Sequence, residues 1–137
     1  MVAVSPVPSI AAPADASVRV EITGLRNAKG DVGCLIFNGP DGYPETHAKA
    51  LKEIQSPIDG EQAVCEFKAI VPGVYAVIVF HDENHNGKLD KNFMGIPQEG
   101  YAASNNIRPL LSAPDFKGAS FIVPAAARTI IKVQVRY

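Results

Sequence analysis

Apolar and polar residues alternate without a fault along Ser17 to Thr23, the first regular segment of the chain. Val18, Val20 and Ile22 fall on one side, and the charged or polar residues between them fall on the other. A period of two places successive side chains on opposite faces of an extended chain. We therefore predict a β-strand with one buried face at 17–23.

Similar patterns recur further along the chain, separated by turns rich in glycine and proline. We predict additional strands at 31–38, 54–58, 63–70, 74–80, 119–123 and 128–137. The segment from Val74 to Phe80 is apolar at every position, which is typical of a strand in the middle of a sheet. Short strands without a long helical period indicate an all-β fold, an antiparallel Greek-key β-sandwich of six to seven strands similar to an immunoglobulin domain.

Two segments interrupt this pattern. A helical turn with Ala48 and Leu51 facing inward is expected within 46–54. Between Phe80 and Lys117 no strand or helix period is recognisable, and loops of that length inside a compact domain are usually functional or disordered. Because apolar residues are spread through this segment, we predict a long ordered loop that caps the sandwich.

Length and composition indicate one domain, at 17–137. The chain has 137 residues, of which 47% are apolar, and this is enough for a single hydrophobic core. The formal net charge of -1 comes from charges spread along the chain, so no basic stripe is available to bind nucleic acid. No apolar run approaches the ~20 residues of a membrane-spanning helix. We expect neither nucleic acid binding nor a membrane span.

Residues 1–16 consist mainly of Ala, Val and Pro and contain no basic residue. Ala14, Asp15 and Ala16 have the small-x-small form of an export cleavage site, although the basic start of a complete signal peptide is absent. We interpret 1–16 as a signal remnant or flexible leader, which predicts a periplasmic or secreted protein. A proline-rich tail on a cytoplasmic protein is the alternative.

The two cysteines fall on the apolar side of their predicted strands. Cys34 is in phase with Val32 and Ile36, and Cys65 is in phase with Phe67. Cysteines that face one core from two strands can form a disulfide between sheets if their Cα atoms lie within about 7 Å, which suits an oxidising compartment. Two buried free thiols are the alternative.

The expected cap begins with a motif typical of calcium loops. Asp82, Asn84 and Asn86 stand at alternate positions and are followed by Gly87, at which the chain would turn. Hard cations take oxygen ligands, and this spacing lets short side chains and a later carbonyl converge on one ion. The predicted ligands are the side chains of Asp82, Asn84, Asn86 and Asp90 and the backbone carbonyl of Lys88.

The match to a calcium loop is partial. Phe93 occupies the twelfth position, where a helix-loop-helix calcium site has a bidentate glutamate. Glu99 or Glu45 would have to complete the site from a distance. We therefore expect weak calcium binding, with a dissociation constant of about 10⁻⁴ to 10⁻³ M.

Two alternatives to calcium remain for this loop. In the first, Asp and Asn form Asx turns that bend the chain after a central strand. In the second, His81 and His85, with Asp82 or Asp90 nearby, bind zinc through imidazole nitrogens. A histidine hydrogen-bonded to backbone at the end of a strand is commoner than a ligand, so a structural His81 is also expected.

The sequence contains no pattern that indicates nucleophilic catalysis, such as a G-x-S-x-G elbow or a glycine-rich phosphate loop. We therefore expect a non-enzymatic protein. Several cap residues could line a pocket for a sugar or a peptide, namely His81, Glu99, Tyr101, Ser104 and Asn105. The alternative is that they satisfy the backbone of the loop itself.

A family resemblance is carried by the segment Val79 to Asn106, which reads V-F-H-D-E-N-x-N-G-K-L-D-x-N-F-x-G-I-P-x-E-G-Y-x-x-S-N-N, and by Val71-Pro-Gly-Val-Tyr75 before it. These residues resemble the signature of an uncharacterised bacterial family known as domain of unknown function 2141. The resemblance extends from about Val18 to Val135 and implies an exported protein with a transthyretin-like or carboxypeptidase-regulatory-like sandwich. It implies no function, and it does not include His85 or the cysteines.

Three functional hypotheses emerge. The first is an exported, non-enzymatic binding or structural module in which calcium holds the cap in place, with a protein, a peptide or a carbohydrate as partner. The second is a small metal-dependent enzyme that uses a zinc site at His81, His85 and Asp82. The third is a metal-free interaction domain that binds a protein through an edge strand or the cap.

Overall fold

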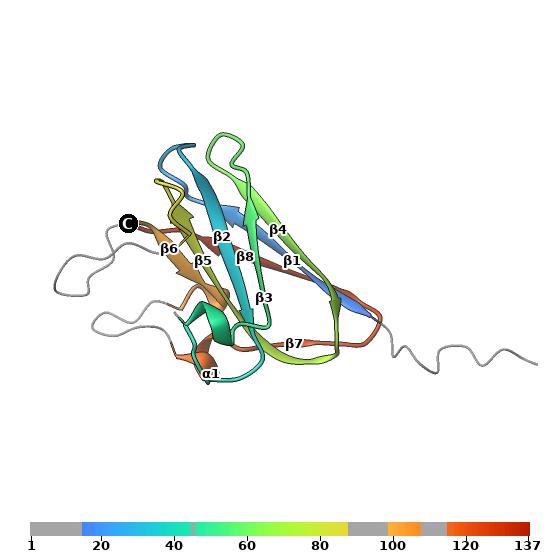
Figure 1. Cartoon of the computed structure of the whole chain (residues 1–137). Helices are drawn as coiled ribbons and strands as arrows, with labels where there is room; N and C mark the ends of the chain where they lie inside the picture. Colours follow the sequence, from blue (N-terminus) through green and yellow to red (C-terminus); the bar gives the residue numbers. More distant parts are fainter. Residues whose placement is uncertain (1–14, 45, 88–98, 108–114) are drawn as a thin grey trace, which may run out of the picture.

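The computed structural model describes residues 15–44, 46–87, 99–107 and 115–137 (Figure 1). Within these ranges the chain is mostly β, with almost no helix. The strands are β1 (Ala16–Thr23), β2 (Asp31–Phe37), β3 (Lys52–Ser56), β4 (Ala63–Ile70), β5 (Gly73–Asp82), β6 (Tyr101–Ala103), β7 (Phe121–Val123) and β8 (Arg128–Gln134). The helical turns are η1 (His47–Lys49), η2 (Ser104–Asn106) and α1 (Phe116–Ala119).

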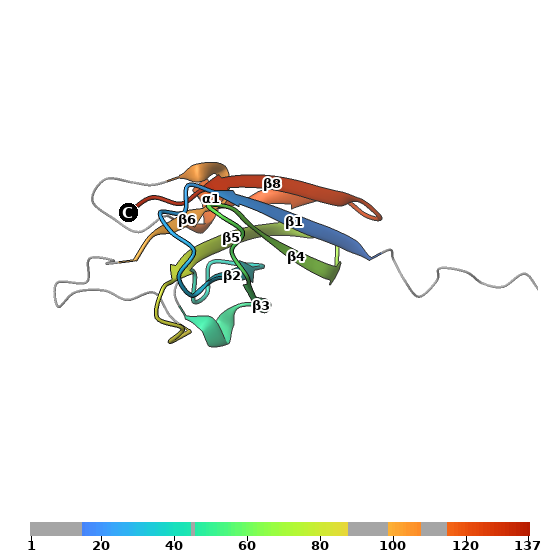
Figure 2. The same ribbon diagram turned by 90° about the horizontal axis from the view of Figure 1, so that it is seen from above.

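The strands form two open sheets. One has the order β4-β1-β8, and the other has the order β3-β2-β5-β6, with β7 pairing with β5 near its start. Figure 2 shows β1 and β8 in one layer and β2, β3 and β5 in the other. No helix in the described part of the chain is long and apolar enough to cross a bilayer.

A hydrophobic core fills the space between the two sheets. Val18, Val20 and Ile22 are buried there, as their alternation predicts, because every second side chain of β1 points away from solvent. A disulfide between Cys34 on β2 and Cys65 on β4 joins the sheets, with a Cα–Cα distance of 6.6 Å. The first of the two expectations for the cysteines is therefore confirmed.

A second apolar cluster covers the other face of the larger sheet. It contains Leu35, Phe37, Ile78 and Phe80, and the segment around η1 and α1 packs over it. Because both faces of β5 are covered, eight consecutive residues from Tyr75 to Asp82 are buried. The prediction of a central strand in this position is confirmed.

The strand pattern differs from the expectation in its details. Eight strands are present among the described residues, where six or seven were predicted, because the short strand β6 lies inside the segment expected to have no regular structure. β1 and β8 pair in parallel, so the sheets are not purely antiparallel as predicted. Alternation of side chains reports which face is buried and carries no information on the direction of the neighbouring strand.

Smaller corrections concern element boundaries: β7 begins at Phe121 instead of residue 119, and β8 ends at Gln134 instead of residue 137. β1 begins at Ala16, one residue before the predicted start, because Ala16 is buried and pairs with Ile70 on β4. β3 covers Lys52–Ser56 instead of 54–58. The helical turn is limited to η1, and Ala48 and Leu51 are exposed, so the prediction that they face inward is wrong. Of the expected cap, residues 88–98 and 108–114 lie outside the described residues.

Candidate functional site

The calcium-type loop begins at the end of β5 with Asp82, which is only 1% exposed. Its Oδ1 accepts a hydrogen bond from the backbone N–H of Asn86 at 3.0 Å, and its Oδ2 accepts one from Gly87 at 2.7 Å. Gly87 has a φ of +78°, a conformation that a residue with a side chain rarely adopts. The carboxylate of Asp82 therefore fixes the tight turn that the sequence predicts at this glycine.

Asn84 and Asn86 follow Asp82 in the same turn. Oδ1 of Asn84 accepts a hydrogen bond from the N–H of Asn86 at 3.3 Å, which is an Asx turn of the kind expected by the metal-free interpretation. A carboxylate has about four lone-pair positions, and these two contacts use one on each oxygen of Asp82. The arrangement is compatible with an oxygen-liganded cation and does not require one.

The remaining predicted ligands, Lys88 and Asp90, lie outside the described residues, as does Glu45. Within residues 15–44, 46–87, 99–107 and 115–137, no group of three or more His, Cys, Asp and Glu side chains is arranged to hold a metal ion. Glu99 lies next to the loop: its Oε2 accepts a hydrogen bond from the N–H of Glu83 at 2.8 Å. Glu99 is buried, and this hydrogen bond places its carboxylate beside the loop.

His81 is completely buried, and both of its ring nitrogens have partners. Nε2 lies 2.8 Å from the carbonyl oxygen of Lys29, which can only accept, so Nε2 carries a proton. Nδ1 lies 2.6 Å from the hydroxyl of Tyr137, and that hydroxyl accepts a hydrogen bond from the N–H of Arg26 at 3.0 Å. In neutral His81, Nδ1 therefore accepts the phenolic proton of Tyr137.

These contacts give His81 the structural role that was expected for a histidine at a strand end. Zinc ligation through His81 would have to replace one of the two hydrogen bonds. His85, the second imidazole of the zinc hypothesis, is exposed, and its Nδ1 lies 3.6 Å from the Asp31 carboxylate. Among the described residues, the hydrogen-bond and ion-pair partners of His81 differ from the partner of His85.

An ion pair between Arg26 and Glu83 lies at the same end of the molecule. The guanidinium of Arg26 contacts both carboxylate oxygens of Glu83, with Nε at 3.0 Å from Oε2, and lies 4.4 Å above the ring of Tyr137. Asn27 also donates to Glu83, at 2.8 Å. The hydrogen bond from Arg26 is the main reason why the pKa of Glu83 is lowered to about 2.

Asp31 brings a further carboxyl group to this region, because it is the register partner of Asp82 across β2 and β5. Partial burial is the main cause that raises the pKa of Asp31, and the neighbouring charge of Asp82 adds to it. The close approach of the two chain segments depends on Gly30, where an added Cβ would lie 1.9 Å from the carbonyl oxygen of Asp82. Sequence spacing alone did not single out Gly30 or Asp31.

The other predicted pocket residues make hydrogen bonds with backbone groups of β5, of the segment around α1 and of the C-terminal segment. Ser104 is buried, and its Oγ accepts from the N–H of Val77 at 3.0 Å and donates to the carbonyl of Ala119. Asn105 donates to two carbonyl oxygens of the segment around α1. The backbone of Tyr101 pairs with Arg136. Ser104 therefore contacts the middle of β5, whereas His81 lies at its end, and a pocket shared by these residues stays a prediction.

Arg26 and Tyr137 are site residues that the sequence analysis missed. Tyr137 is 45% exposed, yet its hydroxyl lies 2.6 Å from Nδ1 of His81 and its ring packs edge-on against the imidazole. Arg26 lies in a turn with no local pattern around it. Arg26 follows the end of β1, and Tyr137 follows the end of β8. Both strands end at the same edge of the fold as β5, and this brings the two residues to the loop.

The fold and the site together define the class of protein. It is a small, mostly β protein whose two sheets are joined by a disulfide, and its central strand ends in a polar loop with internal hydrogen bonds. A family model described as an uncharacterised protein conserved in bacteria, domain of unknown function 2141, matches residues 20–132, and the chain belongs to this family. No curated protein matches the chain, and no solved structure does.

Proposed function

We propose that this protein is an exported, non-enzymatic binding or structural module, a Greek-key β-sandwich of transthyretin-like type in which weakly bound calcium orders the loop at 82–90. The disulfide between Cys34 and Cys65 supports export, because such bonds persist in oxidising compartments such as the periplasm or the outside of the cell. A cation at this loop would order the surface through which the module meets a protein, a peptide or a carbohydrate.

The observation that carries the calcium proposal is the position of Asp82. Its buried carboxylate bends the chain so that oxygen-bearing side chains follow at Asn84 and Asn86, and each of its oxygens keeps a lone pair. No lysine or arginine of the described residues forms an ion pair with Asp82. A hard cation is the chemical group that this set of oxygen atoms suits best.

Calorimetric titration with calcium and thermal unfolding in calcium or chelator test this proposal. We expect a Kd of about 10⁻⁴ to 10⁻³ M and a stabilisation of about 1.4 kcal/mol when free calcium is about ten times the Kd. Asp90→Asn should weaken binding, whereas Asp59→Asn, at an exposed turn remote in sequence, should leave it unchanged. The absence of heat and of any change in melting temperature would reject the metal and favour the metal-free interaction domain.

Zinc in place of calcium distinguishes the enzyme hypothesis. If zinc binds at His81, it must displace Tyr137 or the Lys29 carbonyl, so binding should change the signals of those residues in NMR spectra. The engagement of both His81 nitrogens by protein groups is the reason why calcium is preferred here. Loss of a zinc-dependent activity in His81→Gln would reverse this preference.

A further inference from the structure

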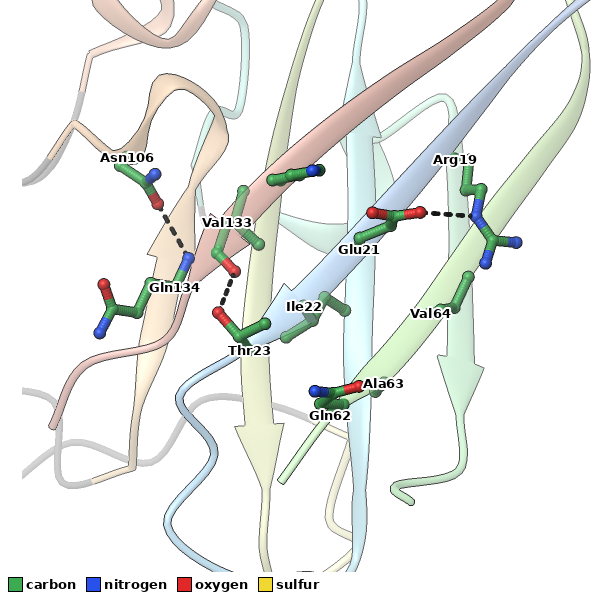
Figure 3. A pocket seen from close by; sticks show the side chains of 11 residues that line it. Arg19, Glu21, Ile22, Thr23, Gln62, Ala63, Val64, Asn106, Val133 and Gln134 are labelled. Atoms are coloured by element: carbon green, nitrogen blue, oxygen red, sulfur yellow. Dashed lines mark hydrogen bonds and ion pairs between the residues drawn. The ribbon is translucent and has the colours of Figure 1, made fainter. Parts of the chain in front are cut away.

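A trough of about 530 Å³ lies on the smaller sheet (Figure 3). It is on the outer face, because Arg19, Glu21 and Thr23 alternate with the buried residues of β1. β1 forms its centre through Arg19, Glu21 and Thr23, and β4 and β8 form its two sides. Figure 3 shows Asn106 and Gln134 at one side of the trough and Gln62 and Val64 at the other. None of these residues belongs to the calcium-type loop.

The walls of the trough are rich in hydrogen-bonding side chains that both donate and accept. The amides of Gln62, Asn106 and Gln134 and the hydroxyl of Thr23 line it, and Asn106 is held in place because its Oδ1 accepts from the N–H of Gln134 at 2.9 Å. Ligands that carry several hydroxyl groups match such walls, since each hydroxyl donates one hydrogen bond and accepts others.

The trough is lined by two positive side chains, Arg19 and Lys132, and by one negative side chain, Glu21, so its net charge is positive. Arg19 pairs with Glu21 through Nε at 3.1 Å, and Lys132 is the register partner of Glu21 on β8. Lys132 forms no ion pair with any described residue. A carboxylate on the ligand would therefore be attracted to Lys132 and to the outer nitrogens of Arg19.

The size and the backbone of the trough argue against an added peptide strand. The backbone of β1 is paired on both sides, by β4 and by β8, so a ligand over β1 can contact side chains only. None of the described residues that line the trough is aromatic, and its volume lies within the range of sites for small molecules. From these features we infer that the trough binds a sugar acid, the uronic acid unit of an acidic glycan.

Two-dimensional NMR titration of the full chain with glucuronic acid tests this inference, in the presence of chelator so that the calcium-type loop does not contribute. We expect saturable shifts of the Lys132 and Gln134 amide signals. Lys132→Gln should weaken binding about five-fold, the effect of one exposed charge. Lys68→Gln, which removes an exposed charge from β4 outside the trough, is the matched control and should change nothing.

Two further probes separate the charge of the ligand from its hydroxyl groups. Glucuronamide keeps the hydroxyls without the carboxylate, and acetate keeps a carboxylate without the hydroxyls, so both should bind more weakly than glucuronic acid. The inference is overturned if acetate binds as tightly as glucuronic acid, if Lys132→Gln has no effect, or if no saturable shift occurs. Because calcium is absent throughout, these outcomes are independent of whether the loop at 82–90 binds a cation.

Discussion

The hydroxyl of Tyr137 lies 2.6 Å from Nδ1 of His81, which joins the last residue of the chain to the end of the central strand. The same hydroxyl accepts from the N–H of Arg26, so three segments far apart in sequence meet at one oxygen atom. The ring of Tyr137 packs closely on Gly100, where an added Cβ would lie 2.4 Å from it. The loop after β5 is therefore held from the side by the C-terminal segment.

Tyr137→Phe should destabilise the fold by about 1–3 kcal/mol, because buried Nδ1 of His81 loses its donor and the N–H of Arg26 loses its acceptor. The free energy of unfolding in urea, measured for the variant and for the unchanged protein, gives this difference. A loss below about 0.5 kcal/mol would mean that water replaces the hydroxyl.

Tyr43→Phe should change the free energy of unfolding in the opposite direction and stabilise the fold. The hydroxyl of Tyr43 is buried without a hydrogen-bond partner among the described residues, and its ring packs edge-on against Phe37 and Phe116. Burial is also the main cause that raises the pKa of Tyr43. Since removal of an unsatisfied hydroxyl relieves a desolvation cost, we expect a gain in stability of up to about 1 kcal/mol in the same urea experiment. A loss of stability would reveal a partner for this hydroxyl.

Glu83→Gln should reduce the sensitivity of the protein to acid. The pKa of Glu83 is lowered to about 2 in the folded state, below its value of about 4.3 in an unfolded chain. The ion pair with Arg26 therefore contributes stability above about pH 4.5, and this contribution is lost as the pH falls towards about 2. Because Arg26 is half exposed, we expect about 1 kcal/mol at neutral pH.

Unfolding free energies of the Glu83→Gln variant and the unchanged protein should thus differ at neutral pH and converge near about pH 2. Glu61→Gln, at an exposed position, serves as the control and should show no such convergence. A constant difference across the whole pH range would show that Glu83 acts through packing instead of charge.

Ser104→Ala should cost about 1–3 kcal/mol, because it leaves the N–H of Val77 in the buried centre of β5 without an acceptor. Ser120→Ala also removes a hydrogen bond to a backbone carbonyl, but at a partly exposed position, so a smaller loss is expected. Thermal unfolding of the two variants compares them directly. Equal losses would contradict the role assigned to Ser104 at the junction of β5, η2 and α1.

Local patterns predicted most of the elements of the fold. The alternation at 17–23, the apolar run at 74–80 and the inward phase of Cys34 and Cys65 all correspond to what the structure contains. Each of these features depends on which side of an extended segment is buried, and this is visible in the residues of the segment itself. β6 escaped prediction because its three residues are too few to show a period of their own and lie inside a long segment without one.

The candidate site was predictable only in its local part. The spacing of Asp82, Asn84 and Gly87 indicated a tight oxygen-rich turn, and the hydrogen bonds of Asp82 form that turn. The pocket proposed for Ser104, Asn105 and His81 stays a prediction, and the structure shows that Ser104 and Asn105 bond to the backbone of β5 and to the segment around α1.

The strand segments, the buried faces and the turn at the end of the central strand could be predicted from the residues alone, because these features depend on contacts between neighbouring residues. The three-dimensional structure was needed to show that β8 runs parallel to β1 and that Arg26 and Tyr137 converge on His81 and Glu83. Arg26 and Tyr137 are 111 positions apart, and contacts at such separations depend on the order and direction of strands in a sheet, which side-chain periodicity does not specify.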